Sequence, residues 1–430
     1  MKGAAMDGQR RDFLKAAGAG FAAAALGGCA SMGAGRLGKV VVVGGGYGGA
    51  TAAKYLHMWS NGGVDVTLVE TNGSFISCPL SNLVLGGSKQ LADIAMTYDG
   101  LVKRGIKIVY DTATAVDAGK RVVRLASGSE LPYDRLVLSP GVDFLYDRVP
   151  GLSSADAQAK VLHAWKAGPQ TQALRAQLVA MADGGVYAIS IPRAPYRCPP
   201  GPYERACQVA WYFKQAKPRS KVLILDGNED VVSKKALFMK AWNEEYKGIV
   251  EYRPNYVLTG VDVATMTAKF ETADDVKANV LNVIPPHRAG NIAMQAGVIT
   301  ANNAWCEVDF LSFESIKVKG IYVLGDSIQI APGMPKSGHM ANQHGKVAAA
   351  AILQSLAGQP VSQAPVLNNT CYSFITDRDV VHVASVHQYD KDKKTLVTVP
   401  GSGGLSPAMN ALEGEYAFSW AKNIWADMLT

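Results

Sequence analysis

The stretch KVVVVGGGYGG at residues 39–49 decides the fold of this chain. Four consecutive valines predict a strand buried on both faces, and Gly44, Gly46 and Gly49 then open a helix through ATAAKYLHM. A second apolar run, VDVTLVE, ends at Glu70, 21 residues after Gly49. Strand, glycine turn, helix and strand in this order form a βαβ unit of the length that binds a dinucleotide. The sequence therefore predicts an α/β nucleotide-binding domain.

Each part of this motif has a physical role in cofactor binding. The glycines let the backbone approach a pyrophosphate, the helix N-terminus offers N–H donors, and Glu70 can accept ribose hydroxyls. A later apolar strand ends in Gly325-Asp326, where flavin reductases hold the ribityl chain and its phosphate. The MPKSG turn then brings Lys336 and Ser337 to the start of a long helix, whose N-terminus can face the flavin ring. We therefore predict FAD as the cofactor.

The place of a second dinucleotide motif is taken by RCPPGPYERAC at residues 197–207. This turn lies between the strands GGVYAISIP and KVLILD, so it belongs to a second βαβ unit. Pro199, Pro200 and Pro202 remove the amide donors that a nicotinamide dinucleotide needs. With Cys198 in that turn, the sequence predicts a flavin that exchanges electrons with sulfur and no NAD(P)H site.

The apolar pattern along the chain predicts an α/β fold, α+β overall. Two Rossmann-like domains of the disulfide-reductase kind are followed by a C-terminal interface region. The expected segments are an export signal (1–33), the first part of the FAD-binding domain (34–150), the second Rossmann-like domain with the cysteine loop (151–285), the second part of the FAD-binding domain (286–358) and a C-terminal domain with the second redox cysteine (359–430).

The N-terminus predicts export to the periplasm. QRRDFLK at residues 9–15 precedes a short apolar run, as in a twin-arginine signal, which serves proteins that fold around a cofactor before crossing. The mature chain would then lie in a compartment where disulfides persist. LGGC at residues 26–29 also resembles a lipoprotein-processing site with Cys29 as the lipidated residue. No later segment is long and apolar enough to predict an integral membrane helix.

Composition excludes one class of partner. The chain has 430 residues and a formal net charge of +7, without the dense Lys/Arg clusters of a nucleic-acid binder. Its length allows two or three domains with sizeable cores. We predict neither nucleic-acid binding nor a metal site.

The cysteines beyond the leader divide into reactive and buried candidates. Cys198 precedes a helix, whose dipole is expected to lower the pKa of the thiol. Cys371, in NNTCYSF, follows a polar turn, and Cys78, in FISCPLSN, lies on the stretch that passes the cofactor. Cys207 and Cys306 stand among apolar residues and are interpreted as buried thiols. A structural disulfide at Cys198 or Cys371, and a Cys198–Cys207 bridge, are open alternatives.

The chain resembles a known family, the flavoprotein subunit of flavocytochrome c sulfide dehydrogenase, which is related to sulfide:quinone oxidoreductases. The segments that carry the resemblance run through the whole chain: RRDFLK, KVVVVGGGYGGATAAKYL, CPLSN, HAWKAG, RCPPGPYERA, VIPPHRAG, MPKSG, HGKVAAAA and NTCYS. The run Cys-Pro-Pro-Gly-Pro-Tyr-Glu-Arg is long and unusual, which makes the match specific. Pro79 and His344 stand at positions where variation is expected.

The resemblance implies roles for four residues. Cys78 matches the cysteine joined through sulfur to FAD, and Cys198 and Cys371 match a redox-active pair beside the flavin ring. Glu204 matches an acidic residue near that pair, which can manage protons; a carboxylate that only stabilises its helix N-terminus is the alternative. Cys207 is an additional thiol, so the pairing stays an implication of the resemblance.

The resemblance also implies oxidation of sulfide to sulfur or polysulfide and transfer of electrons to a c-type cytochrome subunit. The chain has no C-x-x-C-H motif, so the haem would belong to another polypeptide. One rival function is a sulfide:quinone oxidoreductase, but the aromatic C-terminus lacks the basic face of a membrane-binding helix. Another is a non-catalytic flavin relay subunit. The C-terminal segment 415–429 is expected either to bind a partner or to cap the core.

Overall fold

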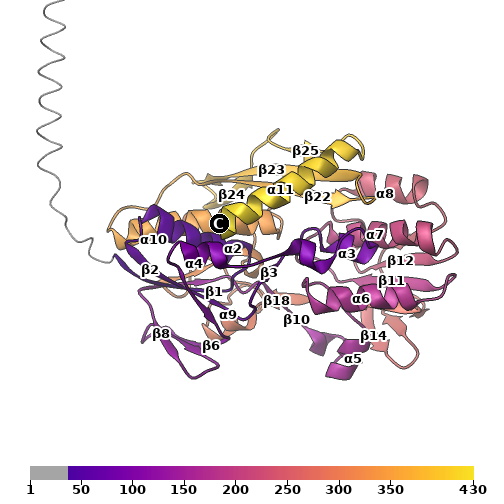
Figure 1. Cartoon of the computed structure of the whole chain (residues 1–430), viewed down its shortest axis with the longest axis horizontal. Helices are drawn as coiled ribbons and strands as arrows, with labels where there is room; N and C mark the ends of the chain where they lie inside the picture. The colour runs from indigo at the N-terminus through magenta and orange to yellow at the C-terminus, as the bar shows by residue number, and fades with distance from the viewer. Residues whose placement is uncertain (1–36) are drawn as a thin grey trace, which may run out of the picture. The chain divides into compact units, whose positions relative to one another are not determined.

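The four-valine strand lies inside a seven-stranded sheet (Figure 1). In the computed structural model, which describes residues 37–430, β1 (Gly38–Val43) is flanked in parallel by β2 (Val64–Glu70) and β9 (Arg135–Leu138). The other strands are β5 (Lys107–Tyr110), β19 (Val308–Asp309), β20 (Glu314–Ser315) and β21 (Ile321–Val323). The strand order is β19-β20-β21-β9-β1-β2-β5. The predicted first βαβ unit is confirmed, with α2 (Tyr47–Trp59) between its strands.

The long helix predicted after the MPKSG turn is α10 (Gly338–Leu356), which packs along α2. Small residues allow the close approach, because a Cβ on Gly345 would lie 2.6 Å from the carbonyl oxygen of Gly48. The two shorter helices of this region are α4 (Asp99–Lys103) and α9 (Asn291–Gln295). α10 thus reaches the same end of the sheet as the glycine turn, and both helices begin beside the cavity described below.

The second Rossmann-like unit is a four-stranded parallel sheet. Its strands are β11 (Val186–Ile191), β12 (Lys221–Asp226), β13 (Val250–Arg253) and β17 (Val280–Val283), in the order β13-β12-β11-β17. Its helices are α5 (Ala155–Lys160), α6 (Pro169–Ala180), α7 (Gly201–Ala216) and α8 (Lys235–Glu244). The cysteine loop joins β11 to α7, as the sequence predicts.

The C-terminal region adds an antiparallel sheet. Its strands are β22 (Val366–Phe374), β23 (Val380–Asp390), β24 (Thr395–Thr398) and β25 (Gly404–Leu405). The final helix, α11 (Ala411–Leu429), lies along β22 and β23 (Figure 1, yellow). It buries Ala417, Ala421 and Ile424, and its last turn accepts hydrogen bonds from the Lys54 ammonium. α11 therefore caps the core, while the binding of a partner by this segment stays a prediction.

Short hairpins and helices complete the described chain. The remaining strands are β3 (Phe75–Ile76), β4 (Ala95–Met96), β6 (Ala113–Asp117), β7 (Val122–Leu125), β8 (Glu130–Pro132), β10 (Val142–Phe144), β14 (Leu258–Asp262), β15 (Thr267–Phe270), β16 (Val276–Lys277) and β18 (His287–Ala289). The remaining helices are α3 (Ser81–Gly86) and the 3-10 turns η1 (Leu91–Ile94), η2 (Tyr146–Arg148) and η3 (Gly325–Ser327). α3 packs against α7 and α6, which links the first Rossmann-like unit to the second.

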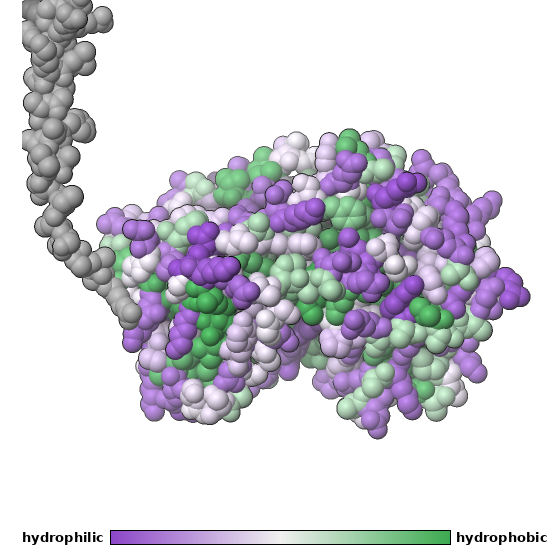
Figure 2. Space-filling model, viewed as in Figure 1, coloured by the Kyte–Doolittle hydropathy of each residue, from purple (hydrophilic) through white to green (hydrophobic). Residues whose placement is uncertain are grey.

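The predicted export signal and Cys29 lie outside the described residues. Within residues 37–430, none of the helices combines the length and the apolar character needed to cross a bilayer. Figure 2 shows hydrophilic side chains over most of the visible face, with smaller apolar patches between them.

Candidate functional site

A cavity of about 650 Å³ lies between the glycine turn, the cysteine loop and the C-terminal sheet. Its wall contains nearly all the side chains and glycines that the sequence singled out. These are Gly44, Gly46, Glu70, Cys78, Cys198, Glu204, Gly325, Asp326, Lys336, Ser337 and Cys371. Gly49 lies behind the wall, where a Cβ would approach the carbonyl oxygen of Gly44 to 1.9 Å. Residues far apart in the chain therefore meet in one site.

The glycine turn leaves room and donors for a phosphate group. Gly44 has a φ of +97°, and a Cβ there would lie 2.4 Å from the carbonyl oxygen of Ser139. Gly46, by contrast, has no protein atom within 4 Å of its Cβ position. It is also the N-cap of α2, and no side chain caps that helix. Free N–H groups at an uncapped helix start beside open space form an anion-binding site.

Glu70 organises the turn from the end of β2. One carboxylate oxygen accepts a hydrogen bond of 2.6 Å from the Gly45 amide. The other accepts bonds from the backbone and side chain of Asn72, at 2.9 and 3.0 Å. The carboxylate still has lone pairs for further donors, because each oxygen can accept more than one bond. Glu70 can therefore hold the turn and accept a ribose hydroxyl together.

Asp326 presents an unused acceptor to the cavity. Its Oδ1 atom is buried and has no hydrogen-bond partner, while Oδ2 lies 3.8 Å from Nε of Arg197. Buried oxygens without partners are rare, and a ligand hydroxyl is one way to satisfy them. Together with the open space at Gly46 and the free start of α2, this oxygen fits a dinucleotide that carries a polyol chain, as FAD does.

Lys336 and Ser337 shape the cavity wall at the start of α10. The Lys336 ammonium donates to the carbonyl oxygens of Asp326 and Ile328, at 2.8 and 2.6 Å, and lies 3.6 Å from the centre of the Trp305 ring. Burial lowers the pKa of Lys336 to about 7. Ser337 caps α10 by accepting from the Met340 amide at 3.1 Å. The ammonium of Lys336 therefore braces the Asp326 turn.

Cys198 occupies a strained position in the loop before α7. Its φ is +57°, in the left-handed region that favours glycine, and its amide donates to the Lys336 carbonyl oxygen at 2.8 Å. The expected lowering of its pKa by the helix dipole is wrong. Burial raises the pKa of the thiol, and the neighbouring Cys371 and Glu204 raise it further.

Cys371 lies within β22. The expectation that it follows a polar turn is wrong, because Asn368, Asn369 and Thr370 are residues of the same strand. The Asn369 amide lies on the same face and contacts Cys371 Sγ at 3.5 Å. Burial raises the pKa of Cys371, while the Lys234 ammonium and the Asn369 amide oppose that rise.

Glu204 is a buried carboxyl in the first turn of α7. Oε1 accepts the Phe374 amide at 3.1 Å, and Oε2 accepts the Asn82 side chain at 3.0 Å. Burial raises the pKa of Glu204, although these bonds lower it. The carboxyl thus connects α7 with the strand of Cys371, and its position suits a proton carrier.

The other three cysteines of the described chain form two groups, one in the cavity wall and two in the core. Cys78 lines the cavity, and its sulfur accepts the Ala167 amide at 3.4 Å. Cys207 and Cys306 are fully buried in the core, which confirms the interpretation of both as buried thiols. Cys207 faces the core of the second Rossmann-like unit, whereas Cys198 and Cys371 both line the cavity. This placement favours Cys371 over Cys207 as the partner of Cys198.

Several charged residues of the site were missed from the sequence. Arg197 lies beside Cys78 and Asp326, and Lys234 contacts the strand of Cys371. Arg205 is buried and donates to the side chains of Asn82 and Asn282. Arg197 and Arg205 belong to the RCPPGPYERAC run, so their position near Cys198 in the sequence could have identified them as site residues. Lys234 stands in an ordinary polar loop, VVSKKA, and no local pattern marks it.

Residues 38–186 match the family of pyridine nucleotide-disulphide oxidoreductases. The two Rossmann-like units, the cavity between them and the added antiparallel sheet define that class of protein and confirm the predicted fold. Residues 171–285 match the central region of the sulfide dehydrogenase [flavocytochrome c] flavoprotein chain, and residues 363–429 match the flavin-binding region of flavocytochrome c sulphide dehydrogenase. The chain belongs to the flavocytochrome c sulfide dehydrogenase flavoprotein family.

The chain is also similar to one flavoprotein chain of this family and to two sulfide:quinone oxidoreductases. One relative is a sulfide dehydrogenase [flavocytochrome c] flavoprotein chain of Chlorobaculum thiosulfatiphilum, to which the chain is 54% identical over 46 residues. The match spans 11% of this chain and 94% of that relative. It is 25% identical over 299 residues, 67% of its length, to a mitochondrial sulfide:quinone oxidoreductase of Dictyostelium discoideum, and spans 65% of that relative. The sulfide:quinone oxidoreductase structure from Aquifex aeolicus shares the fold, with a TM-score of 0.72, 18% identity and 91% coverage of both chains.

Proposed function

We propose that this chain is the flavoprotein subunit of a periplasmic sulfide dehydrogenase, which oxidises hydrosulfide through a Cys198–Cys371 disulfide and FAD. The observation that carries the proposal is that two cysteines from distant parts of the chain line one cavity with the glycine turn. Family membership supports sulfide as the substrate. The sulfur product in this proposal is zero-valent sulfur or polysulfide.

The residues of the cavity suit FAD. In the proposal, Gly46 and the first turn of α2 hold the pyrophosphate, Glu70 the ribose and Asp326 the ribityl chain. When bound, FAD accepts an electron pair from thiols and releases single electrons to a one-electron carrier. Cys78 is the proposed point of covalent attachment.

Hydrosulfide enters by thiol–disulfide exchange. It attacks one sulfur of the disulfide, so that one cysteine becomes a persulfide and the other leaves as a thiolate. Glu204 lies close enough to both thiols to affect their pKa values. Because burial raises its own pKa, Glu204 can exchange a proton with the incoming hydrosulfide.

A c-type cytochrome subunit is the proposed electron acceptor. The chain carries no C-x-x-C-H motif for a haem of its own, and the family name supports a cytochrome partner. The periplasmic location is proposed from the RRDFLK sequence near the N-terminus.

Anaerobic sulfide titration of the purified holoprotein tests the proposed function. We expect sulfide to bleach the flavin absorbance and added c-type cytochrome to restore it, with reduction of the haem. A soluble quinone analogue added under the same conditions is the comparison. Restoration by quinone with no reduction of cytochrome would identify a sulfide:quinone oxidoreductase. A flavin that does not respond to sulfide would reject both functions.

Covalent attachment at Cys78 has a direct test. In an acid-precipitated, reduced tryptic digest, we expect the peptide of residues 55–89 to carry the mass of the flavin. The peptide of residues 289–317, with the buried Cys306, serves as an internal control and should be unmodified. In Cys78→Ser the flavin should remain in the acid supernatant. An unmodified wild-type peptide would contradict the covalent attachment but not FAD binding.

A further inference from the structure

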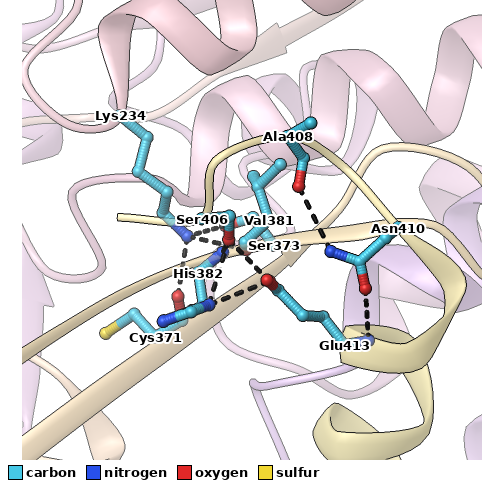
Figure 3. A network of polar contacts seen from close by, with 9 residues as sticks. All are labelled: Lys234, Cys371, Ser373, Val381, His382, Ser406, Ala408, Asn410 and Glu413. Carbon is cyan, nitrogen blue, oxygen red and sulfur yellow. Dashed lines mark hydrogen bonds and ion pairs between the residues drawn. The ribbon is translucent and has the colours of Figure 1, made fainter. Parts of the chain in front are cut away.

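A buried ammonium group lies against the strand of Cys371 (Figure 3). Lys234 comes from the loop before α8, yet its Nζ atom reaches the C-terminal sheet. It donates to the Cys371 carbonyl oxygen at 2.7 Å, to Ser373 Oγ at 2.8 Å and to the Val381 carbonyl oxygen at 3.3 Å. Only 5% of Lys234 is exposed. A buried charge with three hydrogen bonds to one strand pair is costly, which favours a specific role.

The ammonium is well placed to act on the Cys371 sulfur. Side chains alternate along a strand, so Cys371 and Ser373 project from the same face of β22. Because Lys234 donates to the hydroxyl of Ser373, its charge lies on the face that carries the thiol. The Asn369 amide, two residues before Cys371 on that face, also contacts the sulfur.

The groups around Cys371 and Cys198 affect the pKa values of the two thiols differently. For Cys371, burial and Glu204 raise the pKa of the thiol, while Lys234, Asn369 and Ser337 lower it. For Cys198, burial raises the pKa, Cys371 and Glu204 raise it further, and Arg197 opposes them. Arg197 is also engaged by Asp326, whose Oδ2 atom lies 3.8 Å from its Nε atom. A negative charge is therefore better supported on Cys371 than on Cys198.

We propose that Lys234 is a positioning residue that stabilises the Cys371 thiolate and so directs incoming hydrosulfide to the sulfur of Cys198. The proposal rests on the proposed function and specifies its first step. Hydrosulfide forms a bond to Cys198 Sγ while the Cys198–Cys371 bond breaks. Cys198 becomes a persulfide, and Cys371 leaves with the electron pair of the broken bond. One negative charge enters with hydrosulfide and one remains on Cys371, and the disulfide itself is the oxidant of the entering sulfur.

The charge on Lys234 depends on pH and on its neighbours. Burial lowers the pKa of Lys234 to about 8, so the ammonium is mostly protonated near neutral pH and loses its proton in mild alkali. The groups that raise this pKa are Cys371 on β22, Glu204 on α7, Cys198 in the preceding loop and Glu413 on α11. Glu413 is held in turn by Ser406 at 2.5 Å and by His382 of β23 at 2.8 Å (Figure 3).

Thiol alkylation tests the electrostatic role without using sulfide. The holoprotein is reduced with dithiothreitol, treated with iodoacetamide over a pH series and digested with trypsin. Cys371 and Cys198 are then quantified on the peptides of residues 347–378 and 198–205. In Lys234→Met we expect Cys371 to react about tenfold more slowly at neutral pH, the effect of a one-unit rise in its pKa. Lys234→Arg should retain the wild-type rate.

The neighbouring lysine is the matched control. Lys235 is exposed and pairs with Asp230 at the surface, so Lys235→Met should leave the alkylation of Cys371 unchanged. Equal rates and equal pH profiles in wild type and Lys234→Met would overturn the proposal. A slow Cys371 in Lys235→Met as well would also overturn it, because the effect would then not be specific to the buried ammonium.

The position of the persulfide in the wild-type enzyme is a second measurement, and it needs no variant to fold. After brief exposure to sulfide and trapping with iodoacetamide, we expect the additional sulfur on the peptide of residues 198–205. Additional sulfur on the peptide of residues 347–378 would overturn the proposal. If sulfide leaves no persulfide and does not bleach the flavin, the proposed function fails, and the alkylation series still decides the role of Lys234.

Discussion

Cys371→Ser is expected to lower sulfide-driven flavin reduction on the order of 10³-fold or more, because a serine cannot form the disulfide that hydrosulfide attacks. Cys198→Ser should have a similar effect, since either substitution removes the same bond. Stopped-flow bleaching of the flavin under anaerobic conditions measures this rate directly. The flavin itself should still bind, because Gly46, Glu70 and Asp326 lie on other parts of the cavity wall.

Cys207→Ala is the matched control for this experiment. Cys207 is a fully buried thiol on α7 that faces the core of the second Rossmann-like unit, outside the cavity. The variant should keep its sulfide turnover. If Cys207→Ala were inactive and Cys371→Ser active, the redox pair would be Cys198–Cys207. If neither Cys198→Ser nor Cys371→Ser lost activity, the chain would be a flavin relay without disulfide chemistry.

Arg205→Met is expected to lower the free energy of unfolding by about 3–5 kcal/mol, because it removes a buried charge from a network built around it. The guanidinium donates to the side chains of Asn82 and Asn282, at 3.1 and 2.9 Å. It also donates to the carbonyl oxygens of His163 and Ala164, at 2.8 and 2.6 Å. Substitution leaves the Asn82 side-chain oxygen and the Ala164 carbonyl oxygen buried without a donor, and each such loss costs about 1–3 kcal/mol before relaxation. Asn282 Oδ1 keeps the bond from Tyr187, and the His163 carbonyl oxygen keeps the bond from the Asn282 side chain. Urea unfolding followed by tryptophan fluorescence measures the change.

Arg219→Met is the control for the loss of an arginine. Arg219 pairs with Asp183 at 2.7 Å, but its side chain is 77% exposed, so its removal should cost less than about 1 kcal/mol. An equally small effect of Arg205→Met would mean that the buried network relaxes around the gap. The expected importance of that network would then be wrong.

The fold was largely predictable because its signals are local. Four valines, a glycine turn and a helix of small residues form one βαβ unit, and each part depends on neighbours close in sequence. The same holds for the strand before Cys198 and the helix after it. The structure agrees with both predictions. Where the pattern was weaker, the prediction failed: Cys371 follows three polar residues, which favour a turn, but pairing with β23 along nine residues makes the segment a strand.

The site was only partly predictable because its electrostatics depend on tertiary contacts. The glycine positions and the cavity cysteines follow from motifs and from the family resemblance. The pKa of Cys198 does not, since burial and the neighbouring Cys371 and Glu204 outweigh the helix dipole. Lys234 was missed for the same reason. Its polar loop is unremarkable in sequence, and only the packing of that loop against the C-terminal sheet brings the ammonium to Cys371.

Hydrogen bonds from the second Rossmann-like unit to the end of β22 and the residues after it have a consequence for the proposed turnover. In the proposed mechanism the Cys198–Cys371 disulfide opens in every catalytic cycle, so it would not hold the second Rossmann-like unit against the C-terminal sheet throughout turnover. Gln208 donates to the carbonyl oxygens of Phe374 and Thr376 at 3.1 and 2.7 Å, and Tyr246 donates to that of Ile375. These bonds begin three residues beyond Cys371 and do not depend on sulfur. When the proposed disulfide opens, these hydrogen bonds would still hold the two parts together, and the two thiols would stay close enough to re-form it.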